Sequence, residues 1–127
     1  MKYSPQQLDI KYRSYNFALA TIKYLDKIEV KRIFHSLIDQ VIRSSTSIGA
    51  NVVEGKSGSS KKDLIKFFKI ALKSANETKY WICLLREGFN LQKKEINALI
   101  QEADEISKII AASLLTLQGM QRSLKVG

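Results

Sequence analysis

The sequence is poor in the residues that cross-link, kink or bind metal in small proteins. Cys83 is the only cysteine among 127 residues, which excludes an intrachain disulfide and a zinc site built on a cysteine pair. Pro5 is the only proline, and no segment alternates apolar and polar residues between turn signals. The sequence therefore predicts no β-sheet. No uncharged apolar run approaches the roughly 18 residues of a membrane span, and residues 1–7 lack the apolar core of a signal peptide. We therefore expect a cytoplasmic protein without membrane association.

Residues that would indicate catalysis are also scarce. His35 is the only histidine, and it has Arg32 instead of an acid three residues before it, so a metal-binding pair on one helix face is not formed. Cys83 has no neighbouring histidine or acid to activate it as a nucleophile. The segment 50–57 would need glycine in place of Ala50, and a strand before it, to be a phosphate-binding loop. We expect no catalytic residue, no metal ligand and no cofactor, hence a protein that is not an enzyme.

Four segments repeat apolar residues at alternating steps of three and four, which is typical of amphipathic helices. The first is preceded by the capping sequence Ser4-Pro5-Gln6-Gln7 and the third by Ser60-Lys61-Lys62-Asp63. Gly55 is expected in the left-handed conformation that follows the second helix. Caps and spacing together predict helices over residues 4–29, 31–55, 60–87 and 92–120.

The spacing also predicts which residues face the core, while Glu102 and Glu105 are expected on a solvated face of the last helix. The expected inward residues are Leu8, Tyr12, Tyr15, Leu19 and Ile22 in the first helix; Phe34, Leu37, Ile38, Val41, Ser45, Ile48 and Val52 in the second; Leu64, Phe67, Phe68, Ala71, Ala75, Thr78, Ile82 and Leu85 in the third; and Ile96, Leu99, Ala103, Ile106, Ile110, Ser113, Leu117 and Met120 in the fourth. The predicted fold is all-α: one domain over residues 1–127, an antiparallel up-down-up-down four-helix bundle.

Positive charge is what the sequence has in excess. Its 21 lysines and arginines outnumber 12 acidic residues, for a net charge of +9. The segment 56–91 carries eight basic and three acidic residues, which is more than half of this excess. Such a balance favours polyanionic partners, although it can also serve solubility alone.

A row of four lysines, hereafter the lysine row, lies on the expected third helix: Lys62, Lys66, Lys69 and Lys73. At about 100° per residue these positions fall within about 60° of one another, nearly opposite the expected core face. Stacked like charges repel by a few tenths of a kcal/mol per pair, which contact with phosphate would offset. The lysine row, with Lys56 and Lys61 before it, is the candidate nucleic-acid-binding surface; a solubility face is the alternative.

A second pattern suits a contact between subunits. Ser44, Ser47, Asn51 and Glu54 recur at steps of three, four and three along one flank of the second helix, where small polar side chains permit close approach of another helix. The third helix places Trp81 and further apolar residues outside its narrow apolar seam. Oligomerisation would bury them, as would a wide core.

Three blocks of sequence, over residues 43–54, 60–65 and 70–81, resemble the four-helix bundle family named for the 23S rRNA intervening-sequence protein. They are also similar to accessory proteins of diversity-generating retroelements; the runs Ser-Ile-Gly-Ala-Asn at 47–51 and Glu-Thr-Lys-Tyr-Trp at 77–81 carry the likeness. The resemblance implies an antiparallel bundle, a homopentameric ring as in members of known structure and, by likeness to the retroelement proteins, a basic surface that serves RNA or DNA and a reverse transcriptase. Matching positions include Ser47, Asn51, Glu54 and Glu77, whereas Gly55 and Ser74 depart from the common pattern.

The leading hypothesis is an oligomeric module that contacts nucleic-acid backbone through the third helix and the loop before it. The aromatic residues are not arranged for base stacking, so we expect binding with little sequence specificity. Candidate interface residues are Ser44, Ser47, Asn51, Glu54, Glu77 and Trp81. The alternative is an adaptor for a protein partner, for example a reverse transcriptase, with incidental positive charge.

Overall fold

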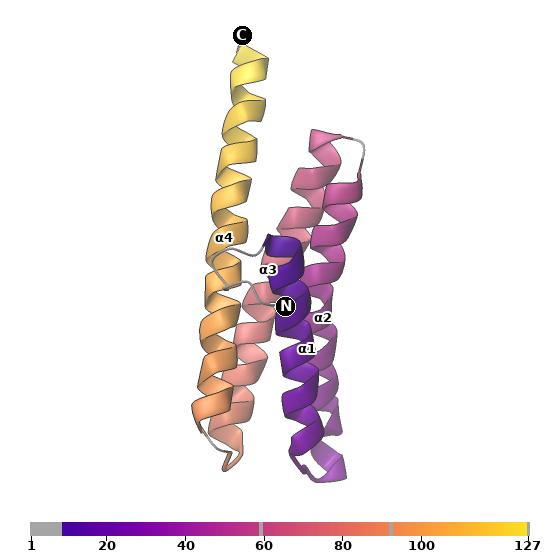
Figure 1. Cartoon of the computed structure of the whole chain (residues 1–127), viewed down its shortest axis with the longest axis vertical. Coiled ribbons are helices and arrows are strands. Elements are labelled where there is room, and N and C mark those ends of the chain that lie inside the picture. Colours follow the sequence, from indigo (N-terminus) through magenta and orange to yellow (C-terminus); the bar gives the residue numbers. More distant parts are fainter. Residues whose placement is uncertain (1–8, 59, 92, 127) are drawn as a thin grey trace.

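The computed structural model is a bundle of long helices (Figure 1), and it describes residues 9–58, 60–91 and 93–126, with side chains up to Gly119. No strand occurs within those ranges. The elements are α1 (Ile10–Lys27), the 3-10 turn η2 (Arg32–Phe34), α2 (His35–Ser57), α3 (Lys61–Gly88) and α4 (Lys93–Val126). The predicted all-α class is confirmed.

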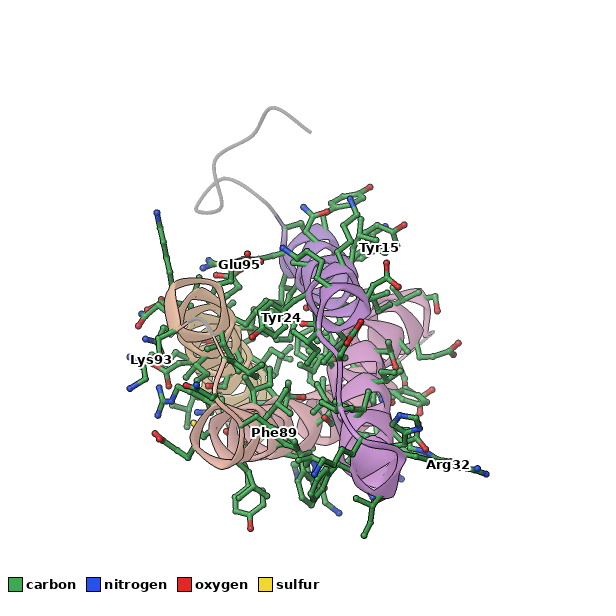
Figure 2. All side chains as sticks on the ribbon, turned by 90° about the horizontal axis from the view of Figure 1, so that it is seen from below. Tyr15, Tyr24, Arg32, Phe89, Lys93 and Glu95 are labelled. Atoms are coloured by element: carbon green, nitrogen blue, oxygen red, sulfur yellow. The ribbon has the colours of Figure 1, made fainter. Side chains whose placement is uncertain are left out.

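Each helix packs against its neighbours in sequence, and α4 closes the bundle by packing against α1. Short connections reverse the chain after each helix, which confirms the up-down-up-down order. Seen end-on, α1 and α3 lie at opposite corners of the bundle (Figure 2). With 18 residues against 34, α1 is only about half as long as α4 at 1.5 Å per residue, so α1 does not reach one end of the bundle (Figure 1).

The core forms along the faces predicted for α2, α3 and α4, except at Phe34, which is 41% exposed and lies before α2. Its members share the three-and-four spacing of those helices, and aliphatic side chains predominate because they interdigitate between closely packed helices. Fully buried are Val41, Ile48, Val52, Ala71, Ala75, Ile82, Leu85, Ile96, Ala103, Ile106 and Ile110. Met120 lies outside the described side chains.

The face predicted for α1 is wrong. Of its expected inward residues, Leu8 lies outside the described range, and the other four are 38–64% exposed: Tyr12, Tyr15, Leu19 and Ile22. The buried face carries Arg13, Ser14, Phe17, Thr21 and Tyr24. Both faces show helical spacing, and packing selects the second because its small residues let α1 approach α2: a side chain added at Gly49 would meet the Ser14 Cβ at 3.4 Å.

The ends of the first two helices differ from the prediction. Asp9 caps α1 through its side chain, which accepts the Lys11 backbone N–H, so the helix begins at Ile10; the capping sequence Ser4–Gln7 lies outside the described residues. Phe34 belongs to η2, where its ring meets that of Phe89 edge-on at 5.1 Å. This contact joins the two connections at one end of the bundle. Residues 32–34 form a separate 3-10 turn, so α2 starts at His35 and not at residue 31.

Gly55 does not end α2. The helix continues to Ser57, and no glycine in the described residues has positive φ. Gly55 is buried against α3, where an added Cβ would lie 3.2 Å from the Phe67 Cβ and from the Phe68 ring. Its role is close packing of two helices. The cap predicted for α3 is confirmed, because the Ser60 side chain accepts the Asp63 backbone N–H at 3.1 Å.

Candidate nucleic-acid interface

The lysine row lies on the solvent face of α3, and its four side chains are all exposed. The opposite face of α3 holds the core residues Phe68, Ala71 and Ile82, which fixes the direction of the row. None of the four lysines forms an ion pair with another described residue. The row therefore presents uncompensated positive charge to solvent.

The next lysine of α3 differs from the row in this respect. Lys79 turns toward α4, where its ammonium donates to Asp104 and to the Ser107 hydroxyl, both at 3.2 Å. Hydrogen bonds from Lys108 and Lys79 lower the pKa of the Asp104 carboxyl. Carboxylates of the bundle thus compensate Lys79, on the flank of α3, and leave its outer face basic.

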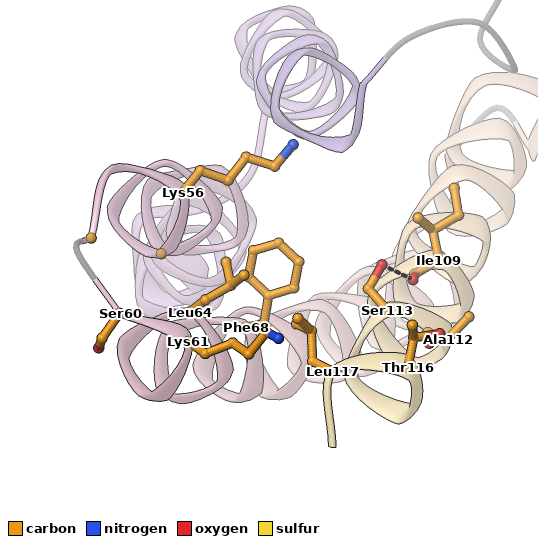
Figure 3. A pocket seen from close by; sticks show the side chains of 12 residues that line it. Lys56, Ser60, Lys61, Leu64, Phe68, Ile109, Ala112, Ser113, Thr116 and Leu117 are labelled. Carbon is orange, nitrogen blue, oxygen red and sulfur yellow. Dashed lines mark hydrogen bonds between the residues drawn. The ribbon is translucent and has the colours of Figure 1, made fainter. Parts of the chain in front are cut away.

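The structure separates Lys56 and Lys61 from the lysine row. Lys56 lies in the last turn of α2, and its ammonium pairs at 2.6 Å with the carboxylate of Asp9, which caps α1. The hydrogen bond from Lys56, followed by that from the Lys11 backbone, lowers the pKa of Asp9. Lys61 lies at the start of α3, beside an open groove (Figure 3). The six lysines expected in one surface therefore form a row of four and a separate pair.

That groove lies where α1 does not reach, between the end of α2, the start of α3 and α4 (Figure 3). Its volume is about 910 Å³. Apolar side chains predominate in its lining, and the two lysines stand beside them; the principal residues are Lys56, Lys61, Leu64, Phe68, Ile109 and Leu117. The sequence alone does not reveal this groove, because the groove depends on the unequal lengths of α1 and α4.

The residues predicted at a subunit contact on α2 are used largely within the chain. Ser44 is 4% exposed, and its hydroxyl donates to the Gln40 carbonyl at 2.9 Å. The Ser47 and Ser74 hydroxyls lie 2.9 Å apart and join α2 to α3, while the Asn51 amide donates to Ser47. Small polar residues here permit close approach, as predicted, but the helix that approaches is α3 of the same chain.

The other predicted interface residues are spread over two helices. Glu54 near the end of α2 and Glu77 on α3 are exposed. Trp81 is half-buried against the core, and its ring meets that of Tyr80 nearly edge-on at 5.0 Å. They do not form one patch with Ser44, which is buried.

An exposed apolar surface lies on α1, on the face that was predicted to line the core. Tyr15 points outward, whereas Tyr24 points into the bundle (Figure 2). We call this surface the α1 outer face; it comprises Tyr12, Tyr15, Leu19 and Ile22. These four large exposed side chains recur at helical spacing and form an apolar stripe along α1.

Arg13 is buried on the inner side of α1 and makes two parallel hydrogen bonds of 2.8 Å to Glu102 of α4. The prediction of a solvated Glu102 is therefore wrong, because the nearby arginine draws it against α1. Glu102 raises the pKa of the guanidinium, which stays charged. The pair ties α1 to α4, where the contact between adjacent helices is least extensive.

Within the described ranges, no three histidine, cysteine or acidic side chains converge as metal ligands would. No helix there has the length and apolarity to cross a membrane. His35 is exposed at the start of α2, and Cys83 is half-buried.

Comparison with known proteins agrees with the fold. A search among curated proteins gave no match. A crystal structure of a protein of unknown function from the S23 ribosomal protein family of Bacteroides thetaiotaomicron is similar, with a TM-score of 0.74 and 29% sequence identity. The match covers 84% of this chain and 98% of that one. A profile of the 23S rRNA-intervening sequence protein matches residues 6–112, and the chain therefore belongs to that family.

Proposed function

We propose that this protein is a non-enzymatic, self-associating module of the cytoplasm that binds the phosphate backbone of nucleic acid through the lysine row. One observation carries the proposal: four exposed lysines share one face of α3 without a carboxylate partner among the described residues. Lysines in this arrangement release counterions when they meet phosphates, which gives an affinity that does not depend on base sequence. The family's association with 23S rRNA in its name is consistent with such a ligand.

Self-association would proceed through the α1 outer face, and a homopentamer is the assembly that the family resemblance implies. The α1 and α3 helices occupy opposite corners of the bundle, so a contact at α1 leaves the lysine row of each subunit accessible (Figure 2). Several rows in one assembly would engage one nucleic acid together, which raises the overall affinity without new contacts.

The experiment replaces the lysine row by glutamine and measures binding to a labelled duplex by fluorescence anisotropy over a range of salt. Glutamine continues a helix almost as well as lysine, so the fold should persist. The slope of log affinity against log salt should become shallower by about 0.9 for each phosphate that the variant no longer neutralises. The matched control removes equal charge from exposed lysines elsewhere: Lys23, Lys31, Lys93 and Lys94.

The proposal requires the row variant to bind more weakly than this control. Equal binding by both variants would mean that the lysine row contributes only through the net charge of the protein. Absence of binding by the parent protein at about 50 mM salt, where phosphate contacts are strong, would overturn the proposal.

A second candidate function is an adaptor for a protein partner, and the groove at the end of the bundle favours it. An acidic amphipathic helix would place apolar residues over Leu64 and Phe68 and a carboxylate near Lys61, since Lys56 is already paired with Asp9. If the protein does not bind nucleic acid, this candidate takes precedence. A Leu64→Glu variant would then lose the partner while the row variant keeps it.

A further inference from the structure

The lysine row continues into an exposed aromatic residue. Tyr80 follows Lys73 by seven residues, which is two helical turns, so the two side chains leave the same face of α3 about 10.5 Å apart along the axis. The Tyr80 side chain is 62% exposed. An exposed ring on the face of the lysine row is a candidate for base stacking, which was not expected from the sequence.

The ring of Tyr80 is exposed but not loosely held. It meets the Trp81 ring nearly edge-on, with 5.0 Å between centroids and 77° between planes. Trp81 packs against the core, so it anchors its neighbour. A platform that is already ordered loses little conformational entropy when a flat ligand stacks on it.

The surface between the lysines and Tyr80 changes in chemistry along α3. A shallow depression of about 560 Å³ is lined by Lys69, Leu72, Lys73, Asn76, Glu77 and Tyr80. The Glu77 carboxylate would repel phosphate, but it can accept hydrogen bonds from exocyclic amino groups of bases. The Asn76 amide can both donate and accept. The lysine end thus suits a backbone and the Tyr80 end suits a base.

We propose that α3 binds a single-stranded segment, with phosphates on Lys69 and Lys73 and an unpaired base stacked on Tyr80. This inference rests on the proposed function, and it specifies the ligand as unpaired nucleic acid. A base inside a duplex is stacked on its neighbours and cannot reach the ring, whereas a free base can stack and present its edge. Bases with an amino group, which are adenine, cytosine and guanine, would be preferred over uracil or thymine at the position next to Glu77.

The test compares single strands and duplexes of the same sequence, as RNA and as DNA, by fluorescence anisotropy. The Tyr80→Leu variant should weaken binding of the preferred single strand by about tenfold, within the range for loss of one base–aromatic stack. Duplex binding should stay unchanged. Tyr80→Phe should behave as the parent, because a phenyl ring also stacks. Equal melting temperatures of parent and variants would exclude a folding defect.

Trp81 gives a second readout, since it is the only tryptophan. A base that stacks on Tyr80 must approach the neighbouring indole, so its emission should change with single strands and stay constant with duplexes. Emission that responds equally to both ligands would contradict the inference.

The outcomes separate the two proposals. If Tyr80→Leu binds single strands as tightly as the parent while the lysine variant loses binding, the phosphate surface stands and the stacking site is refuted. An equal loss for single strands and duplexes would also refute stacking. If the parent binds neither form, the proposed function fails and the inference fails with it.

Discussion

Helices α1 and α3 stand at opposite corners of the bundle and distribute their side chains in opposite ways. Helix α3 buries apolar residues and exposes lysines, whereas α1 buries Arg13, Ser14 and Thr21 and exposes Tyr15 and Leu19. The more apolar face of α1 is therefore directed outward. This outward stripe is the observation on which the proposed self-association rests. The packing of α1 against the rest of the bundle depends on Phe17 and on the ion pair between Arg13 and Glu102.

The largest expected effect concerns Phe17, which is 2% exposed and is the largest apolar residue on the inner face of α1. Phe17→Ala should lower the free energy of unfolding by about 3–5 kcal/mol, because it leaves a cavity between α1 and the core. Phe17→Leu should cost less than about 1.5 kcal/mol. Urea denaturation measures both, with exposed Lys23→Ala as the control. A small effect of Phe17→Ala would mean that α1 buries its other face.

A smaller effect is expected from the ion pair between α1 and α4. Glu102→Gln leaves the buried Arg13 guanidinium without its charged partner, which should cost about 1–3 kcal/mol of unfolding free energy. The control Lys27→Gln breaks the exposed pair with Glu95 and should cost less than about 1 kcal/mol. Replacing both Arg13 and Glu102 by methionine should recover stability relative to Glu102→Gln. Failure to recover would show that the arginine contributes by packing and not as a charge that needs a partner.

The smallest effect concerns the Tyr24 hydroxyl, which is buried without a hydrogen-bond partner among the described residues. Burial, and then the charge of Glu95, raises the pKa of this phenol. The Tyr24 phenol therefore stays neutral in the folded protein at pH values where it ionises in the unfolded chain. Its contribution to the free energy of unfolding is complete below about pH 10 and declines above it. Tyr24→Phe should remove this alkaline decline and raise stability at pH 7 by up to about 1 kcal/mol. Urea denaturation at pH 7 and above about pH 10 tests both expectations, with exposed Tyr15→Phe as the control. A loss of stability at pH 7 in Tyr24→Phe would contradict them.

The sequence was sufficient for α3 and insufficient for α1, for physical reasons. In α3 the Ser60 cap, the apolar seam and the lysines all agree on one orientation. In α1 two faces have the same spacing, and the choice depends on Gly49 of α2 and Glu102 of α4, which no local pattern reveals. Gly55 was misassigned for the same reason, since its close contact with Phe67 is tertiary.

The candidate nucleic-acid interface could also be predicted only where it depends on spacing within one helix. The lysine row follows from helical spacing alone. The pairing of Lys56 with Asp9 joins residues 47 positions apart, so the sequence did not separate Lys56 from the row. Tyr80 could have been found, because it follows the lysines at the spacing of two further turns.

We propose separate functions for the two outer faces: self-association at α1 and nucleic-acid binding at α3. The most direct test measures mass by light scattering and affinity by anisotropy on the same samples of parent, lysine-row variant and a Tyr15→Glu/Leu19→Glu variant. The account predicts that the lysine-row variant keeps a mass well above 14.4 kDa but loses binding. The α1 variant should fall to the monomer mass and retain weaker binding with a shallower salt slope. A monomeric parent, or an α1 variant with unchanged mass, would contradict the account.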